Sequence, residues 1–180
     1  MLEIEVKVKV QLDEMEISLR NLGFLKGTVV YEKDTYYNGR QVDLKKEDKA
    51  LRIREHRDLE SNVTTYVLNF KGPKLDDSTM TREETQFEVP SLEIGETVLN
   101  GLGFFATDGV EKVRTHYLKE VVTCCLDDVT GLGEFLEIEV IAEEKGYDAA
   151  IEKIKGLLGR LGLSMRDTVR ESYLSMAQRF

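Results

Sequence analysis

The sequence has little of what disulfide-bonded or membrane-spanning proteins depend on. Its 180 residues include two cysteines, two prolines, two histidines and no tryptophan. Cys124 and Cys125 are adjacent, and neighbouring side chains of a strand point to opposite faces, so the two thiols are poorly placed to bond each other. The longest apolar runs fall far short of the ~20 residues that a membrane helix needs, and the first ten residues alternate charges instead of forming a signal peptide. We therefore expect a cytoplasmic protein without membrane partners.

The composition is that of one folded domain. Hydrophobic residues make up 41% of the chain and charged residues 33%, which excludes disordered and collagen-like chains. A domain of this size buries roughly 70% of its extended surface, enough for a hydrophobic core. The net charge is -9, with 34 acidic against 25 basic residues, and this argues against a nucleic-acid surface. We predict a single domain over 1–180.

The apolar pattern predicts a mixed α+β protein. Residues 2–10 alternate strictly between apolar and charged side chains, which is typical of a strand with one buried face. Helices are predicted over 13–22, with an Asp13–Glu16 capping box, from Ser91 to a stop at Gly103, and from Asp148 to a stop at Gly162. The predicted strands are 2–10, 28–38, 50–57, 63–71, 81–89, 110–117, 119–128 and 134–142.

One stretch of sequence repeats at an offset of 80. Residues 19–37 match 99–117, with identical residues that include the Gly23/Gly103 and Phe24/Phe104 pairs. A duplicated strand–helix–strand unit with four strands in each half predicts a closed antiparallel eight-stranded β-barrel with helices packed outside. The polar segment 72–80 is the best candidate for a mobile loop.

The charged residues also follow the strand pattern. Arg52 and Arg54, for example, alternate with Leu51 and Ile53. If the apolar faces pack under helices, the charged faces turn into the barrel, whose interior can hold one small ligand. Cations confined in such a cavity repel one another, so we expect a bound anion. The candidate interior charges are Glu3, Glu5, Lys7, Arg52, Arg54, Lys71, Arg82, Glu84, Lys112, Arg114, Asp127, Glu137 and Glu139.

The acidic residues suggest a divalent cation. Glu3 and Glu5, like Glu137 and Glu139, are separated by two positions and face the same side of a strand. Carboxylate oxygens near phosphate-binding cations suit Mg²⁺ or Mn²⁺, which share the phosphate oxygens of a substrate. The alternative is a solvated sheet face with weak cross-strand ion pairs, as would occur in a plain structural barrel.

The ordered motifs resemble the CYTH superfamily, the triphosphate tunnel metalloenzymes, which includes class IV adenylyl cyclases and thiamine-triphosphatase-like enzymes. The resemblance covers nearly the whole chain. The Lys71–Pro73 element, the Asp127–Glu139 element and the late serine–tyrosine are most like the class IV cyclase branch. The motifs are E-x-E-x-K (3–7), EKDTYY (32–37), LRIR (51–54), FKGP (70–73), TREE (81–84), EKVR (111–114), LDDVTGLGEFLEIE (126–139) and ESY (171–173).

The resemblance implies a tunnel in which basic residues bind a triphosphate and acidic residues hold one or two divalent cations, Mg²⁺ or Mn²⁺. It gives the catalytic role to Glu3, Glu5, Glu137 and Glu139. It also makes a homodimer plausible. The metal role would fall to those four glutamates, with Asp127 as a further candidate, and the phosphate-binding role to Lys7, Arg52, Arg54, Lys71, Arg82, Lys112 and Arg114.

Three functions remain open from the sequence. A class IV adenylyl cyclase would convert ATP to cyclic AMP and pyrophosphate. A triphosphatase would hydrolyse tripolyphosphate, thiamine triphosphate or a nucleoside triphosphate in the same tunnel, and a binding module would hold a phosphorylated ligand without catalysis.

Two positions depart from the family pattern. Strand parity favours Glu84 over Glu83 as the inward acid, and it places Phe135 beside Glu137, which predicts a bulge or a buried aromatic ring there.

Overall fold

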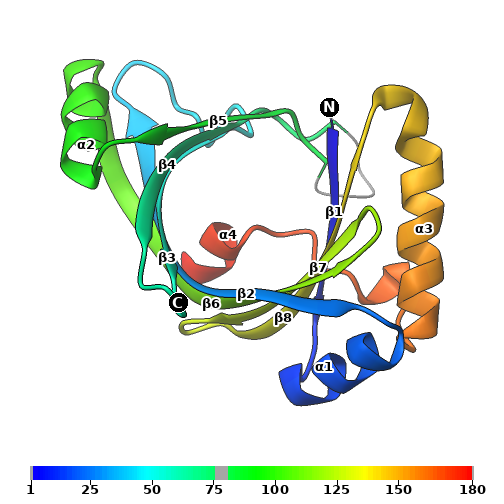
Figure 1. Ribbon diagram of the computed structural model, residues 1–180. Coiled ribbons are helices and arrows are strands. Elements are labelled where there is room, and N and C mark those ends of the chain that lie inside the picture. Colours follow the sequence, from blue (N-terminus) through cyan, green and yellow to red (C-terminus); the bar gives the residue numbers. More distant parts are fainter. Residues whose placement is uncertain (1, 76–80, 180) are drawn as a thin grey trace.

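The computed structural model describes residues 2–75 and 81–179, which form an α+β domain (Figure 1). Its strands are β1 (Leu2–Lys9), β2 (Leu25–Gly39), β3 (Ala50–Asp58), β4 (Thr64–Lys71), β5 (Glu84–Val89), β6 (Phe104–Lys119), β7 (Val122–Val129) and β8 (Gly133–Ala142). Its α-helices are α1 (Leu12–Asn21), α2 (Leu92–Gly101), α3 (Tyr147–Arg160) and α4 (Tyr173–Ala177).

All eight strands belong to one antiparallel sheet in the order β1-β8-β7-β6-β2-β3-β4-β5. The sheet curls strongly, as Figure 1 shows, with α1, α2 and α3 outside the curve and α4 inside it. Ile4, Val6 and Val8 of β1 are buried in the main core, together with Ile154 and Leu158 of α3. The opposite face of β1, with its charged residues, therefore points into the curve of the sheet.

The sheet does not close into the barrel that the sequence predicts. In the described part of the chain, β1 meets the segment just before β5 at a single bridge, between Glu3 and Arg82. This antiparallel register places β5, which starts only at Glu84, beyond the first residue of β1, so the two edge strands cannot pair along their length. The predicted closed barrel is thus an eight-stranded half-barrel.

The repeat at an offset of 80 appears as a two-fold arrangement of the sheet. Read from either end, the strand order is the same once β1 is matched with β5, β2 with β6, β3 with β7 and β4 with β8. The long strands β2 and β6 pair at the centre, and Glu32 lies directly opposite Lys112, its partner at the same offset. The structure therefore confirms two related halves of four strands each.

Helix ends agree with the sequence in part. Gly23, Gly103 and Gly162 follow helices with φ between +74° and +89°, a backbone conformation that glycine adopts without strain. The Ser91 cap is confirmed, because its side chain accepts a hydrogen bond from the backbone N–H of Ile94. The Asp13 and Asp148 caps are wrong: the helices begin earlier, at Leu12 and Tyr147, and neither has a side-chain cap.

The observed strand lengths differ most from the predicted ones where the strand pairing is irregular. Both β2 and β6 extend beyond their predicted ranges, because register shifts near Lys26 and Thr35 interrupt the two-residue periodicity that predicts a strand. Cys124 and Cys125 are free and buried, as expected. Of the predicted loop 72–80, residues 76–80 lie outside the described residues. Within the described residues, no helix is long and apolar enough to cross a membrane.

The packing of α3 on β8 gives a test of the core. Ile138 is fully buried in that core, whereas Ile141 of the same strand is 63% exposed. Ile138→Ala should lower the free energy of unfolding by about 2–5 kcal/mol, because it removes buried methyl groups and leaves a cavity. Ile141→Ala, the matched control, should change it by less than about 0.5 kcal/mol. Equal urea midpoints for the two variants would contradict this core.

Candidate active site

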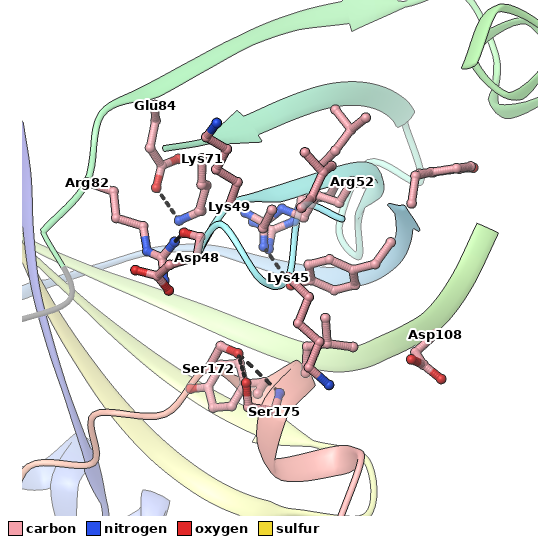
Figure 2. A pocket seen from close by; sticks show the side chains of 18 of the residues that line it. Lys45, Asp48, Lys49, Arg52, Lys71, Arg82, Glu84, Asp108, Ser172 and Ser175 are labelled. Atoms are coloured by element: carbon pink, nitrogen blue, oxygen red, sulfur yellow. Dashed lines mark hydrogen bonds and ion pairs between the residues drawn. The ribbon is translucent and has the colours of Figure 1, made fainter. Parts of the chain in front are cut away.

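A cavity of about 430 Å³ lies inside the curve of the sheet. Charged side chains from β1, β3, β4, β6 and β8 line it, and α4 contributes Tyr173, Leu174 and Ser175. Figure 2 shows Ser172 and Ser175 on one side of this space, with Asp48, Lys49 and Arg52 across from them. The charged strand faces therefore meet in one partly open cavity, which also receives the end of the chain.

Four cations on β3 and β6 form one wall of the cavity: Arg52, Arg54, Lys112 and Arg114. Each is held by a carboxylate that lies behind it. Glu32 is 2.7 Å from the Lys112 Nζ and 3.0 Å from the Arg54 Nη1. Arg114 donates through Nε and Nη2 to both oxygens of Asp127, at 2.7 and 2.6 Å. These anchors hold the cations in fixed positions along the cavity.

The repulsion expected among these cations is therefore reduced by buried carboxylates. The carboxylates of Glu32, Asp34 and Asp127 are at most 3% exposed and offset much of the positive charge. Burial would raise the pKa of Glu32, but Arg54 and Lys112 outweigh it and hold that pKa well below its usual range. Burial and the nearby Arg54 and Arg114 lower the pKa of Lys112, so some positive potential persists at this wall.

Three glutamates form a separate acidic group. Glu3, Glu5 and Glu139 each place a carboxylate oxygen within 4.8 Å of the other two. Burial raises the pKa of all three, that of Glu139 to about 8, and repulsion from neighbouring glutamates, Glu137 among them, adds to the effect. Lys7 lies 3.6 Å from Glu5 and Arg114 lies 3.5 Å from Glu139, but these contacts do not offset the effect of burial. Three hard oxygen donors whose charge is only partly offset are a suitable site for Mg²⁺ or Mn²⁺.

Glu137 and Asp127 are arranged differently from that group. Glu137 lies 3.0 Å from the Lys7 Nζ and also forms an ion pair with Arg114. Lys7 and Arg114 outweigh burial and hold the pKa of Glu137 well below its usual range. Asp127 is fully buried and, besides holding Arg114, accepts a hydrogen bond from the Tyr173 hydroxyl at 2.8 Å. Both carboxylates therefore have cationic partners within the protein.

The remaining predicted cations lie toward β5 (Figure 2). Lys71 forms an ion pair with Glu84. Arg82 donates from Nη1 to the backbone carbonyls of Asp48 and Gly72, at 2.6 and 2.8 Å, and so connects two loops. Glu84 lines the cavity and Glu83 is exposed, as strand parity predicted. All twelve predicted site residues except Asp127 line the cavity.

An aromatic pair occupies the end of the site. Phe135 is buried, and its ring packs edge-to-face on Tyr173 with centroids 5.1 Å apart. The pairing of β7 with β8 has no register shift there, so the buried ring is confirmed and the bulge is not needed. The Tyr173 ring also lies 4.1 Å from the Lys7 Nζ, close enough for a cation–π contact.

Four residues of this site have no role that the sequence predicts: Glu32, Asp34, Asp48 and Tyr173. Parity within EKDTYY would place Glu32 and Asp34 on one face, but only the pairing of β2 with β3 shows which cations they meet. Asp48 lies in a loop with φ of +52°, and no strand pattern covers it. Tyr173 comes from the end of the chain, for which no periodic signal indicates proximity to β1.

The fold and cavity define a class of α+β proteins with a curled antiparallel sheet around a charged ligand site. The family model described as "CYTH domain" matches residues 1–173 of this chain. The chain belongs to the CYTH family. A protein of Methanocaldococcus jannaschii named "Putative adenylate cyclase MJ0240" is 35% identical over 179 residues, which cover 98% of each chain.

Solved structures share the fold. The PH1819 protein of Pyrococcus horikoshii is 34% identical, with a TM-score of 0.88 over 98% of both chains. A protein from Hippeastrum, described as a "Putative adenylyl cyclase" that reveals a dominant triphosphatase activity, is 19% identical, with a TM-score of 0.65 over 99% of this chain and 95% of that one. At this identity the second likeness is one of fold alone.

The raised pKa of Glu139 predicts a pH effect on metal-free protein. Glu139 is protonated up to about pH 8 in the folded state but ionises near pH 4.5 when unfolded, so its contribution to stability falls as the pH rises between these values. Glu139→Gln should therefore stabilise the protein relative to wild type at pH 8 more than at pH 5. Thermal unfolding in EDTA checks this, and adding Mn²⁺ should raise the melting temperature of wild type more than that of the variant.

Proposed function

We propose that this protein is a metal-dependent enzyme that acts on a triphosphate, and that its reaction is the conversion of ATP to cyclic AMP and pyrophosphate. The observation that carries the proposal is the division of one cavity into two parts. A wall of fixed cations faces the space from β3 and β6, and the acidic group of Glu3, Glu5 and Glu139 faces it from β1 and β8. A polyphosphate with a bound divalent cation needs both parts.

The acidic group would hold Mg²⁺ or Mn²⁺. When bound there, the metal ion would neutralise phosphate oxygens and lower the pKa of an attacking hydroxyl. Glu137 lies on the same strand as Glu139, and its oxygens already contact Lys7 and Arg114. Lys7 also lies 3.6 Å from Glu5, and Arg114 lies 3.5 Å from Glu139, but the contacts of these cations with Glu137 are shorter, at 3.0 Å for Lys7 and closer still for Arg114. We therefore assign Glu3, Glu5 and Glu139 as the primary ligands, Glu137 as a bridge to the cations, and Asp127 to holding Arg114.

The cations would bind and orient the phosphates. Arg52 lines the cavity, and its buried Nε has no hydrogen-bond partner among the described residues, so a donor is available for an anionic ligand. Phosphoryl transfer depends mainly on positioning and on stabilising negative charge. In the cyclase reaction the ribose 3′-hydroxyl attacks the α-phosphorus in line and pyrophosphate leaves, while Arg54, Lys112 and Arg114 stabilise the departing charge.

The second candidate is a triphosphatase, in which water attacks the terminal phosphorus. The same cavity suits both reactions, since they differ in which phosphorus lies next to the metal-holding group. The relative at 35% identity carries a cyclase name, which supports the first candidate. The Hippeastrum protein shows that this fold occurs with both descriptions, so the fold does not decide between them.

A product assay separates these candidates. Purified protein is incubated with ATP and either Mg²⁺ or Mn²⁺, with tripolyphosphate and thiamine triphosphate in parallel, and the products are resolved by phosphorus NMR. We expect cyclic AMP and pyrophosphate from ATP. Inorganic phosphate without cyclic nucleotide would assign a triphosphatase instead. Binding of triphosphates without turnover would assign a binding module.

Lys112→Met tests the cationic wall. Lys112 is buried, and its loss leaves Glu32 still paired with Arg54, so we expect a modest change in melting temperature. The affinity for tripolyphosphate in the presence of Mg²⁺ should fall at least tenfold, or about 1.4 kcal/mol, as measured by calorimetry. Lys33→Met on the outer, exposed face of β2 is the matched control and should bind as wild type does. Unchanged affinity in the Lys112 variant would remove this residue from the ligand site.

A further inference from the structure

The EKDTYY motif contains a carboxylate, Asp34, that contacts two arginines of the cavity at once. Its Oδ1 accepts from the Arg54 Nε at 2.7 Å, and its Oδ2 accepts from the Arg54 Nη2 at 2.8 Å and the Arg52 Nη1 at 3.0 Å. Asp34 is only 2% exposed. Burial would raise its pKa, but the two arginines outweigh it and hold that pKa below its usual range.

These contacts fix the arginines without using all their donors. A guanidinium has five N–H groups. Asp34 and Glu32 take three from Arg54, through Nε, Nη2 and Nη1. Arg52 uses Nη1 for Asp34 and the Tyr36 hydroxyl, and its Nε stays without a partner among the described residues. Both arginines line the cavity, whereas Asp34 lies behind them.

We infer that Asp34 is a positioning residue, which fixes the planes of Arg52 and Arg54 so that their remaining N–H groups meet a triphosphate. The inference rests on the proposed function. Two-point contact from Asp34 to Arg54 sets the orientation of that guanidinium, and the shared Oδ2 sets its spacing from Arg52. A fixed pair of guanidinium groups binds phosphate oxygens with less loss of side-chain freedom than two mobile ones.

The substitution Asp34→Asn gives opposite results for a positioning role and for simple charge balance. If Asp34 only reduced the positive charge, its removal would strengthen the binding of an anion. If Asp34 positions the arginines, removal should weaken the binding of tripolyphosphate with Mg²⁺ at least tenfold, measured by calorimetry well below the melting temperature. Glu111→Gln on β6, which breaks the exposed ion pair of Glu111 with Lys33 of β2, is the control and should bind as wild type does.

A second variant keeps the charge. Asp34→Glu retains the carboxylate but moves it by one methylene, so a positioning role predicts weaker binding of tripolyphosphate with an unchanged net charge. Affinity equal to wild type in Asp34→Glu, or equal or tighter binding by Asp34→Asn, would overturn the inference alone. Absence of tripolyphosphate binding by wild type would overturn the proposed function and this inference together.

One measurement needs no ligand. In ¹⁵N-labelled protein the Arg54 Nε–H, which donates to Asp34, should give a resonance protected from exchange with water. Asp34→Asn should speed this exchange at least tenfold, while the backbone resonances of β3 stay in place. Equal exchange in the two proteins would show that Arg54 is fixed without Asp34, and would overturn the inference whatever the reaction is.

Discussion

A charged side chain can lie inside this sheet only if an opposite charge lies beside it. Moving an unpaired ion out of water costs several kcal/mol, and a carboxylate with well-directed hydrogen bonds offsets that cost. Arg114 with Asp127, Arg54 with Asp34 and Lys112 with Glu32 all follow this rule. The cations therefore stay charged while buried, which is the condition for a fixed anion site. Glu3, Glu5 and Glu139 follow the rule least well: Lys7 is 3.6 Å from Glu5 and Arg114 is 3.5 Å from Glu139, too far to offset burial, and the pKa values of all three acids are raised.

The two-fold arrangement of the sheet explains where these pairs come from. Glu32 and Lys112 occupy matching positions of the repeat and face each other at the centre. Asp34 and Arg114 also match, and the partners across the next strands are Arg54 and Asp127. At these positions the two halves thus have the same strand arrangement but carry side chains of opposite charge. Glu32 and Lys112 neutralise each other across the centre, whereas Asp34 with Arg54 and Arg114 with Asp127 do so within their own halves. The acidic group falls on β1 and β8 alone.

The strand periodicity gives the faces of the sheet but not its partners. Alternation in 2–10 was enough to place Glu3, Glu5 and Lys7 on the cavity side, because a strand alternates its side chains by geometry. Barrel closure could not be predicted this way, since it depends on the register between β1 and the chain before β5. The carboxylates behind the cations cannot be predicted for a related reason. Asp34 acts by contacting arginines of β3, and the strand pattern does not say which residues of β3 lie opposite it.

The open edge of the half-barrel is also what admits the end of the chain. Thr168 forms a β-bridge with Val8, and the Val169 N–H donates to the Lys7 carbonyl. The segment before α4 therefore covers the C-terminal half of the β1 edge, whereas the Glu3–Arg82 bridge lies at its N-terminal end. In Figure 1 the chain then passes into the curve of the sheet. That path brings Tyr173 onto Lys7, Asp127 and Phe135. A fully paired β1 edge would exclude this segment, so incomplete closure and the aromatic end of the cavity are two aspects of one arrangement.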